Sequence, residues 1–305
     1  MNQVMLRKLL TLAVLLGTTA VAPFSMAGVT IVGSSTLEPF LKQWVQAYQA
    51  KAPDAEINIS SPGTSVAPKA LISGKADLAA MNREMTNDES EAFIRIHGHY
   101  PIGIAVAIEA VALYAHPGNP VKGLDFKEVD AIFSASHGCG WGEDIKRWGQ
   151  LGLPAPWDKQ AIMLLGHDKK SAVRDFFNKS VLCRDDFVSE IEELSHEQIL
   201  AKVAQTRNAL AYSRYQPDTK LKLVPLKKGA GDYVELTPAN VYNRSYRLQH
   251  FMYLYVNKSS GKPVPAAVAD FIKTGLSQNG QAAVAAAGYI PLSDELIQRQ
   301  LSKLK

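Results

Sequence analysis

Three segments of the chain share one layout, in which a short run of β-forming residues leads through a loop into a helix. In the first, residues 29–32 precede a Gly-Ser-Ser-Thr loop, and apolar rings then recur at Phe40, Trp44 and Tyr48. A spacing of four residues places these rings on one face of a helix. The other two units are residues 57–71 and 161–181. Strands that alternate with helices predict an α/β fold with largely parallel sheets.

The loops of these units carry groups that bind anions. A helix N-terminus presents unpaired N–H groups and the positive end of the helix dipole, and ligands of α/β sheets bind at the carboxyl ends of the strands. We therefore expect the loops to converge on one tetrahedral oxyanion. The alternative is that each hydroxyl only caps its own helix, a common role of Ser and Thr. The hydroxyl residues are Ser34, Ser35, Thr36, Thr64, Ser65 and Ser171.

The first 27 residues have the three parts of a secretory signal. Arg7 and Lys8 precede an apolar run at 9–22, and Ser25 and Ala27 fit the cleavage requirement. The run is short for a membrane span, which needs about 20 residues. We predict cleavage after Ala27 and a periplasmic protein.

Composition limits the partners of the chain. It has 305 residues, of which 47% are hydrophobic and 20% charged, so about two folded domains are expected. The formal net charge of +4 includes two charges of the signal segment. The sequence contains no Lys/Arg block interleaved with aromatic residues, so we do not expect nucleic acid to be a partner.

Two cysteines, Cys139 and Cys183, lie beyond the predicted cleavage site. In an oxidising compartment such a pair more often forms a disulfide than remains as two thiols. Two cysteines without further ligands supply too few donors for a metal site. We expect a disulfide, no metal and no cofactor.

Six longer motifs extend the pattern over nearly the whole chain after residue 27. They are residues 32–36 (Val-Gly-Ser-Ser-Thr), 63–71, 77–85, 129–134, 251–258 and 288–292. In these motifs the chain resembles the phosphate-binding proteins of the bacterial phosphate ABC transporter, which have the type II periplasmic binding-protein fold. The resemblance implies an α/β protein of two lobes, each a mostly parallel sheet flanked by helices, joined by hinge strands.

The resemblance also implies an organisation and a role. We expect lobe 1 at 28–115 with 245–305 and lobe 2 at 116–244, with the apolar runs 104–114 and 251–256 as hinge strands. In this family the lobes close on phosphate and the loaded protein docks on a membrane permease. We therefore expect a monomeric, non-enzymatic protein that captures phosphate or a related oxyanion for ABC-type uptake.

The third loop departs from the family pattern. The family has an arginine near the start of this loop and Ser-Gly-Thr at the helix entry, which clamp the phosphate. Here residues 166–173 read Gly-His-Asp-Lys-Lys-Ser-Ala-Val. His167 stands at the arginine position, and Ala172 and Val173 replace the glycine and the threonine. Histidine is mostly neutral near pH 7, so we expect weaker phosphate binding, a changed ligand, or a protonated His167 in the role of the arginine.

The candidate ligand-binding residues come from both lobes. Asn82 stands where the family usually has a small hydroxyl residue before Arg83, and Ala172 and Val173 offer only backbone amides. No catalytic residue is assigned. The full set is Ser35, Thr36, Thr64, Ser65, Asn82, Arg83, His167, Ser171, Ala172 and Val173.

Two other functions stay open at this point. The altered third loop is compatible with a degenerate envelope module that serves in signalling or adhesion and does not take part in transport. A phosphoesterase on the same fold is the second alternative, with His167 and Asp168 near Ser171. Adjacent residues of one loop rarely form a catalytic triad, because the geometry of a triad is spatial.

Overall fold

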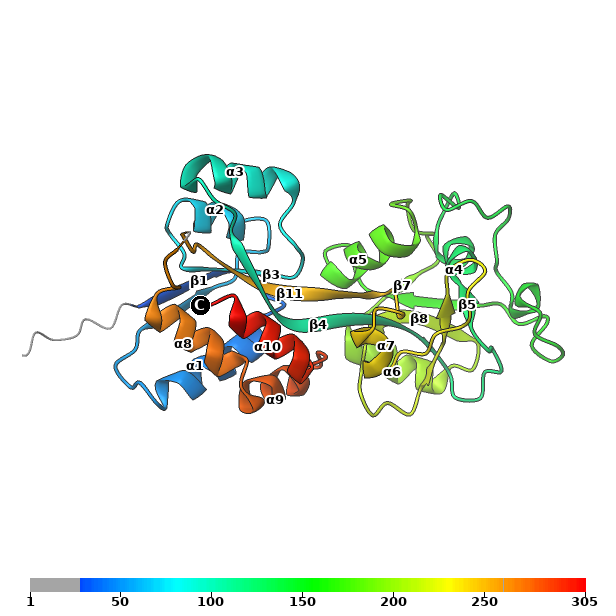
Figure 1. Cartoon of the computed structure of the whole chain (residues 1–305). Helices are drawn as coiled ribbons and strands as arrows, with labels where there is room; N and C mark the ends of the chain where they lie inside the picture. Colours follow the sequence, from blue (N-terminus) through cyan, green and yellow to red (C-terminus); the bar gives the residue numbers. More distant parts are fainter. Residues whose placement is uncertain (1–27, 260) are drawn as a thin grey trace, which may run out of the picture.

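Two long antiparallel strands run through the middle of the molecule and join two groups of elements (Figure 1). The computed structural model describes residues 28–259 and 261–305, so the predicted signal segment 1–27 lies outside the described residues. β4 (Ile102–Ala115) and β11 (Gln249–Val256) pair along the whole of β11. They coincide with the apolar runs that were predicted as hinge strands. No described helix has the length and apolar character needed to cross a membrane.

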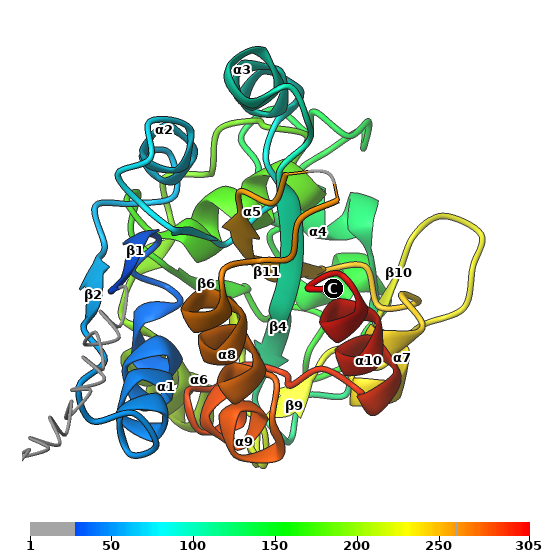
Figure 2. The ribbon, with the colours of Figure 1, turned by 60° about the vertical axis from the view of Figure 1, so that its left-hand side comes forward.

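Lobe 1 is a sheet between two layers of helices (Figure 1). Its strands β1 (Val29–Gly33), β2 (Ile57–Ser60) and β3 (Leu78–Met81) are parallel, with β1 in the middle, and β3 pairs with β11. Figure 2 shows α1 beside α8 and α9, where Trp44 is fully buried. The helices are α1 (Glu38–Gln49), α2 (Ala67–Ile72), α3 (Asn87–His97), α8 (Ala266–Gly275), α9 (Gln278–Ala286) and α10 (Asp294–Ser302).

Lobe 2 continues the same path of strands. The far half of β4 pairs with β8 (Ala209–Arg214), which is parallel to β6 (Met163–Gly166), and β6 pairs with β7 (Glu192–Glu193). The remaining elements are β5 (Leu124–Asp125), α4 (Phe126–Phe133), η1 (Trp148–Leu151), α5 (Ala172–Val181), α6 (His196–Gln205), β9 (Lys222–Leu223), β10 (Leu226–Lys227) and α7 (Pro238–Tyr242).

The predicted fold class is confirmed. The strand order β2-β1-β3-β11-β4-β8-β6-β7 puts parallel strands at both ends and the antiparallel pair β11 and β4 between them. All three predicted strand–loop–helix units are present, as β1–α1, β2–α2 and β6–α5. In lobe 2, the ring of Tyr212 on β8 stacks on Phe177 of α5 with centroids 4.2 Å apart, which fixes α5 against the sheet.

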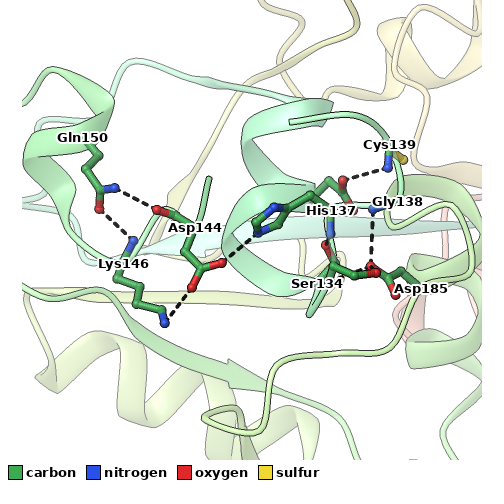
Figure 3. Close-up of polar contacts among 10 residues, drawn as sticks. Ser134, His137, Gly138, Cys139, Asp144, Lys146, Gln150 and Asp185 are labelled. Atoms are coloured by element: carbon green, nitrogen blue, oxygen red, sulfur yellow. Dashed lines mark hydrogen bonds and ion pairs between the residues drawn. The ribbon is translucent and has the colours of Figure 1, made fainter. Parts of the chain in front are cut away.

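A disulfide joins Cys139 to Cys183 in lobe 2, as predicted. Hydrogen bonds order the loop around it (Figure 3): the Cys139 N–H donates to Asp130, and the Asp185 carboxylate accepts from the N–H of Gly138. Farther along the loop, His137 Nε2 lies 2.9 Å from the carboxylate of Asp144. None of these residues lines the two cavities described below.

Candidate functional site: a cleft between the lobes

The loops after β1, β3 and β6 open into one cleft beside the hinge strands. A larger cavity of about 850 Å³ and a smaller cavity of about 360 Å³ lie there. Both are lined by Ser35, Thr36, Ser171 and Ala172, so they meet where α1 and α5 begin. We call these four residues the junction. A ligand at the junction would contact both lobes.

The structure brings all ten predicted ligand-binding residues to this cleft. Besides the junction, the larger cavity is lined by Thr64, Ser65, Asn82 and Arg83. The smaller cavity adds His167 and Val173. Segments that are more than a hundred residues apart in the sequence therefore line one space, as convergence of the loops requires.

The hydroxyls of the junction do not cap their helices. The N-cap of α1 is Leu37, because its N–H and that of Glu38 bond back to the carbonyls of Ser34 and Ser35 in a tight turn. Ser171 occupies the N-cap position of α5, but its side chain accepts no bond from the first turn. Simple capping therefore does not hold for Ser35, Thr36 and Ser171, whereas the Ser34 hydroxyl accepts a bond from the Thr36 N–H at 3.2 Å. The hydroxyls of Ser35, Thr36 and Ser171 are therefore available to an anion, and so are the first-turn N–H groups of α5, whereas the N–H groups of Leu37 and Glu38 are already bonded.

On the lobe 1 side, Thr64 and Asn82 are already joined. The Thr64 hydroxyl donates to Asn82 Oδ1 at 2.7 Å. This bond leaves the Asn82 amide nitrogen without a protein partner among the described residues. Asn82 therefore presents a neutral donor to the larger cavity.

Arg83 lines the larger cavity, but its charge is engaged. Its Nη1 and Nη2 donate to the two oxygens of Glu89 at 2.7 and 2.8 Å. Glu89 also closes the capping box of α3 with Thr86, and the bond from Arg83 lowers the pKa of the Glu89 carboxyl. A bidentate pair of this kind orients the guanidinium toward Glu89. Arg83 thus contributes to the wall of the cavity with its charge compensated.

His167 does not replace the family arginine as a cation. Its side chain is buried, and its Nε2 lies 2.8 Å from the hydroxyl of Ser213. Burial, with the nearby His196 and Arg214, lowers the pKa of His167 to about 4. The imidazole is therefore neutral near pH 7, so of the three alternatives for this loop its desolvation disfavours a protonated His167.

Arg214 supplies a cation at this place, and the sequence analysis missed it. It ends β8 and lines the smaller cavity together with His167. Its guanidinium carbon lies 5.8 Å from the ring centroid of Tyr289, whose hydroxyl donates to the Thr36 carbonyl. Within the described part of the chain Arg214 forms no ion pair closer than 4.0 Å. Its position at the carboxyl end of a parallel strand is the signal that could have identified it.

Glu109 is the second residue that the sequence analysis missed. It lies in the middle of β4, is only 3% exposed and lines the smaller cavity. Its Oε2 lies 3.2 Å from His250 Nε2 without a hydrogen bond between them, and its Oε1 has no hydrogen-bond partner either. It is the single charge within the apolar run 104–114, which was a visible signal in the sequence.

The larger cavity is positively charged. Five Lys and Arg side chains line it against two acidic ones. Asp175 is paired with Lys179 at 2.6 Å, and Glu84 accepts a bond from Tyr253. Lys169, Lys170 and Arg244 form no ion pair within the ranges that the structure describes. The surplus positive charge favours an anionic ligand.

The histidines of the smaller cavity contact a buried serine and do not belong to a metal-binding group of the described residues. Ser213 is the serine that contacts His167 and His196, but it is 0% exposed and cannot reach a substrate. In the described residues, no three His, Cys, Asp or Glu side chains are grouped so that they could hold a metal ion.

Comparison with known proteins places the chain among binding proteins. A family model described as a PBP superfamily domain matches residues 18–277. The phosphate-binding protein PstS of Pseudomonas aeruginosa is 37% identical over 276 residues, which are 90% of this chain and 85% of the relative. PstS of Staphylococcus aureus is 25% identical over 278 residues, 90% of this chain and 81% of that protein.

Solved structures agree on the fold. An ABC-type phosphate transport receptor from Vibrio cholerae has a TM-score of 0.69 at 18% identity and covers 87% of this chain and 100% of its own. PstS from Borrelia burgdorferi has a TM-score of 0.67 at 17% identity, with coverage of 87% and 99%.

Proposed function

We propose, from the premise that this chain belongs to the phosphate ABC transporter substrate-binding family of the PBP superfamily, that it captures phosphate or a related oxyanion in the interlobe cleft. The relatives are binding proteins, which supports capture without chemistry and favours neither the phosphoesterase nor the degenerate module. The ligand is held at the junction, by the hydroxyls of Ser35, Thr36 and Ser171 and the amides of Ala172 and Val173.

The observation that carries this proposal is the pair of open helix N-termini across the cleft. The N-termini of α1 and α5 come from different lobes, have no side-chain cap and line shared cavities. Both offer the positive end of a helix dipole to an anion; α5 adds first-turn N–H donors, and α1 adds the hydroxyls of Ser35 and Thr36. Binding at the junction would therefore draw the two lobes together.

Arg214 takes over the charge of the missing family arginine. It reaches the smaller cavity from β8, close to the loop in which His167 stands. A hydrogen bond to a charged group contributes about 1.5–3 kcal/mol, and the guanidinium keeps its charge at any physiological pH. The altered loop at 166–173 thus does not remove the cation from the site.

The route of delivery follows from the same premise. We infer export to the periplasm with cleavage after Ala27, closure of lobe 1 (28–115 with 245–305) on lobe 2 (116–244), and docking of the monomer on an ABC permease. The hinge is the strand pair β4 and β11, which connects the lobes (Figure 1). Closure around a ligand is the recorded behaviour of periplasmic binding proteins.

The test is calorimetric titration of the mature protein, residues 28–305, after unfolding, dialysis and refolding to remove any bound ligand. We expect phosphate to bind with micromolar or tighter affinity, and Ser35→Ala with Ser171→Ala to weaken it. Absence of binding to phosphate and to sulfate, with folding confirmed by circular dichroism, contradicts the proposal.

A further inference from the structure

The smaller cavity differs in charge from the larger one. Its charged side chains are Arg214, Glu109 and Glu197. Its two histidines, His167 and His196, have lowered pKa values because both are buried, so they carry no charge near pH 7. Once Arg214 contacts an oxyanion at the junction, the rest of this cavity holds two carboxylates and no cation. Such a lining disfavours a second anionic group and favours a cationic one.

Glu109 gives a second, independent indication of a ligand group. The residue is 97% buried, and its Oε1 has no hydrogen-bond partner. His250 lies beside the other oxygen, Oε2, at 3.2 Å. A buried polar atom without a partner is costly, and more so on a charged group. Because Glu109 lines the smaller cavity, a donor that enters this cavity from solvent lies next to the Glu109 carboxylate.

The size of the smaller cavity also exceeds what a bare anion needs. Its volume of about 360 Å³ lies within the range of sites for organic ligands, which is about 300–1,000 Å³. It shares the four junction residues with the larger cavity. A ligand whose oxyanion sits at the junction can therefore extend a short substituent toward Glu109.

We propose that the preferred ligand is zwitterionic, with a tetrahedral phosphorus oxyanion at the junction and a primary ammonium group, on a short alkyl chain, that donates to Glu109. This chemistry occurs in aminoalkylphosphonates and in phosphate monoesters of amino alcohols. The proposal rests on the proposed function, since it uses the same oxyanion site. It adds that the smaller cavity selects ligands that carry an ammonium group.

The test compares matched ligands on the refolded wild-type mature protein by calorimetry. 2-Aminoethylphosphonate is set against ethylphosphonate, and phosphoethanolamine against ethyl phosphate, so that each pair differs by one amine. We expect the amine to strengthen binding about tenfold or more in at least one pair, the gain of a charge-assisted hydrogen bond. The pair with the larger gain identifies the phosphonate or the ester as the source of the ligand.

Two variants assign the effect to its residue. Glu109→Gln is expected to abolish the advantage of the amine, whereas Glu91→Gln, at a surface position of α3, is expected to keep it. Thermal unfolding checks that both variants fold, and the wild-type comparison stands without them. Equal affinity within both ligand pairs overturns this inference alone, as does an advantage that survives in Glu109→Gln. Absence of binding to phosphate and to all four compounds overturns the proposed function as well.

Discussion

The Nε2 atom of His167 lies 2.8 Å from the hydroxyl oxygen of Ser213, at the buried end of the β6–α5 loop. The same hydroxyl is 2.7 Å from His196 Nδ1, so one serine joins two imidazoles. The His167 carbonyl accepts a bond from Arg174 at 2.8 Å. The loop that carries Ser171 is thus fixed from behind by two neutral imidazoles and by Arg174, which is paired with Glu193 at 3.0 Å, and the cation that lines the cavity, Arg214, comes from β8.

This buried cluster predicts how stability depends on pH. Burial lowers the pKa of His167 to about 4, below its ordinary value of 6.5. Between these values the unfolded chain binds the proton and the folded chain does not, so stability falls as pH decreases from 6.5 toward 4. We expect a loss on the order of 2–3 kcal/mol from this residue. Urea unfolding at several pH values measures it. His167→Gln should reduce the loss of unfolding free energy at low pH. The control His99→Gln, outside the cleft, should show the same loss as the wild type. If the loss in His167→Gln equals that of the wild type, His167 is not its source.

Arg214 is predicted to supply the charge that phosphate requires. Replacing it by methionine removes a charged donor that forms no ion pair within 4.0 Å among the described residues, which should weaken phosphate binding about ten- to a hundredfold. Arg207→Met is the control, because Arg207 lies over Trp157, away from the cleft. Calorimetric titration of both variants with phosphate measures the two affinities. Wild-type affinity in Arg214→Met would show that the cation of the site is another residue.

The junction serines are predicted to matter for binding and not for folding. Ser35→Ala and Ser171→Ala should each weaken phosphate binding about tenfold or more, with the free energy of unfolding within about 0.5 kcal/mol of wild type. Ser277→Ala provides the reverse case, because Ser277 caps α9 by accepting from Gly280. It should lose about 1 kcal/mol of stability and keep its affinity. A stability loss in Ser171→Ala with unchanged binding would restore the capping role.

The disulfide is predicted to stabilise lobe 2 without shaping the site. Cys139 and Cys183 are separated by 44 residues, and cross-linking a loop of this length contributes about 4 kcal/mol in the chain-entropy account. Cys139→Ser with Cys183→Ser should lower the free energy of unfolding by about that amount in urea titrations. Phosphate affinity should stay within twofold, since neither cysteine lines the cleft. A large loss of affinity in a folded double variant would contradict this separation.

The sequence identified the elements that lie close together along the chain. The strand–loop–helix units are visible because their apolar spacing and loop residues are local, and the apolar runs at 104–114 and 251–256 indicated the hinge strands. The spacing of residues along the chain does not show whether the loops of these units lie close together in space. The order of the strands in the sheet shows that they do.

Two residues of the cleft could not be predicted from the sequence because their roles depend on tertiary structure. Arg214 ends the apolar strand β8, after which the sequence shows no glycine-rich loop, and its position beside His167 results from the pairing of β8 with β6. Glu109 stands out as a charge in an apolar run, but only the structure shows that one of its oxygens is buried without a partner. Of the alternatives that the sequence left open for the loop at 166–173, a protonated His167 is disfavoured by burial, which the sequence does not show.

The most direct measurement is a crystal structure of the ligand-stripped mature protein after addition of phosphate. We expect a tetrahedral anion at the junction, within hydrogen-bond distance of the α1 and α5 N-termini and of Arg214, with the lobes closer together than without ligand. A cleft that stays empty at millimolar phosphate, or an anion bound away from Ser35 and Ser171, would contradict the account.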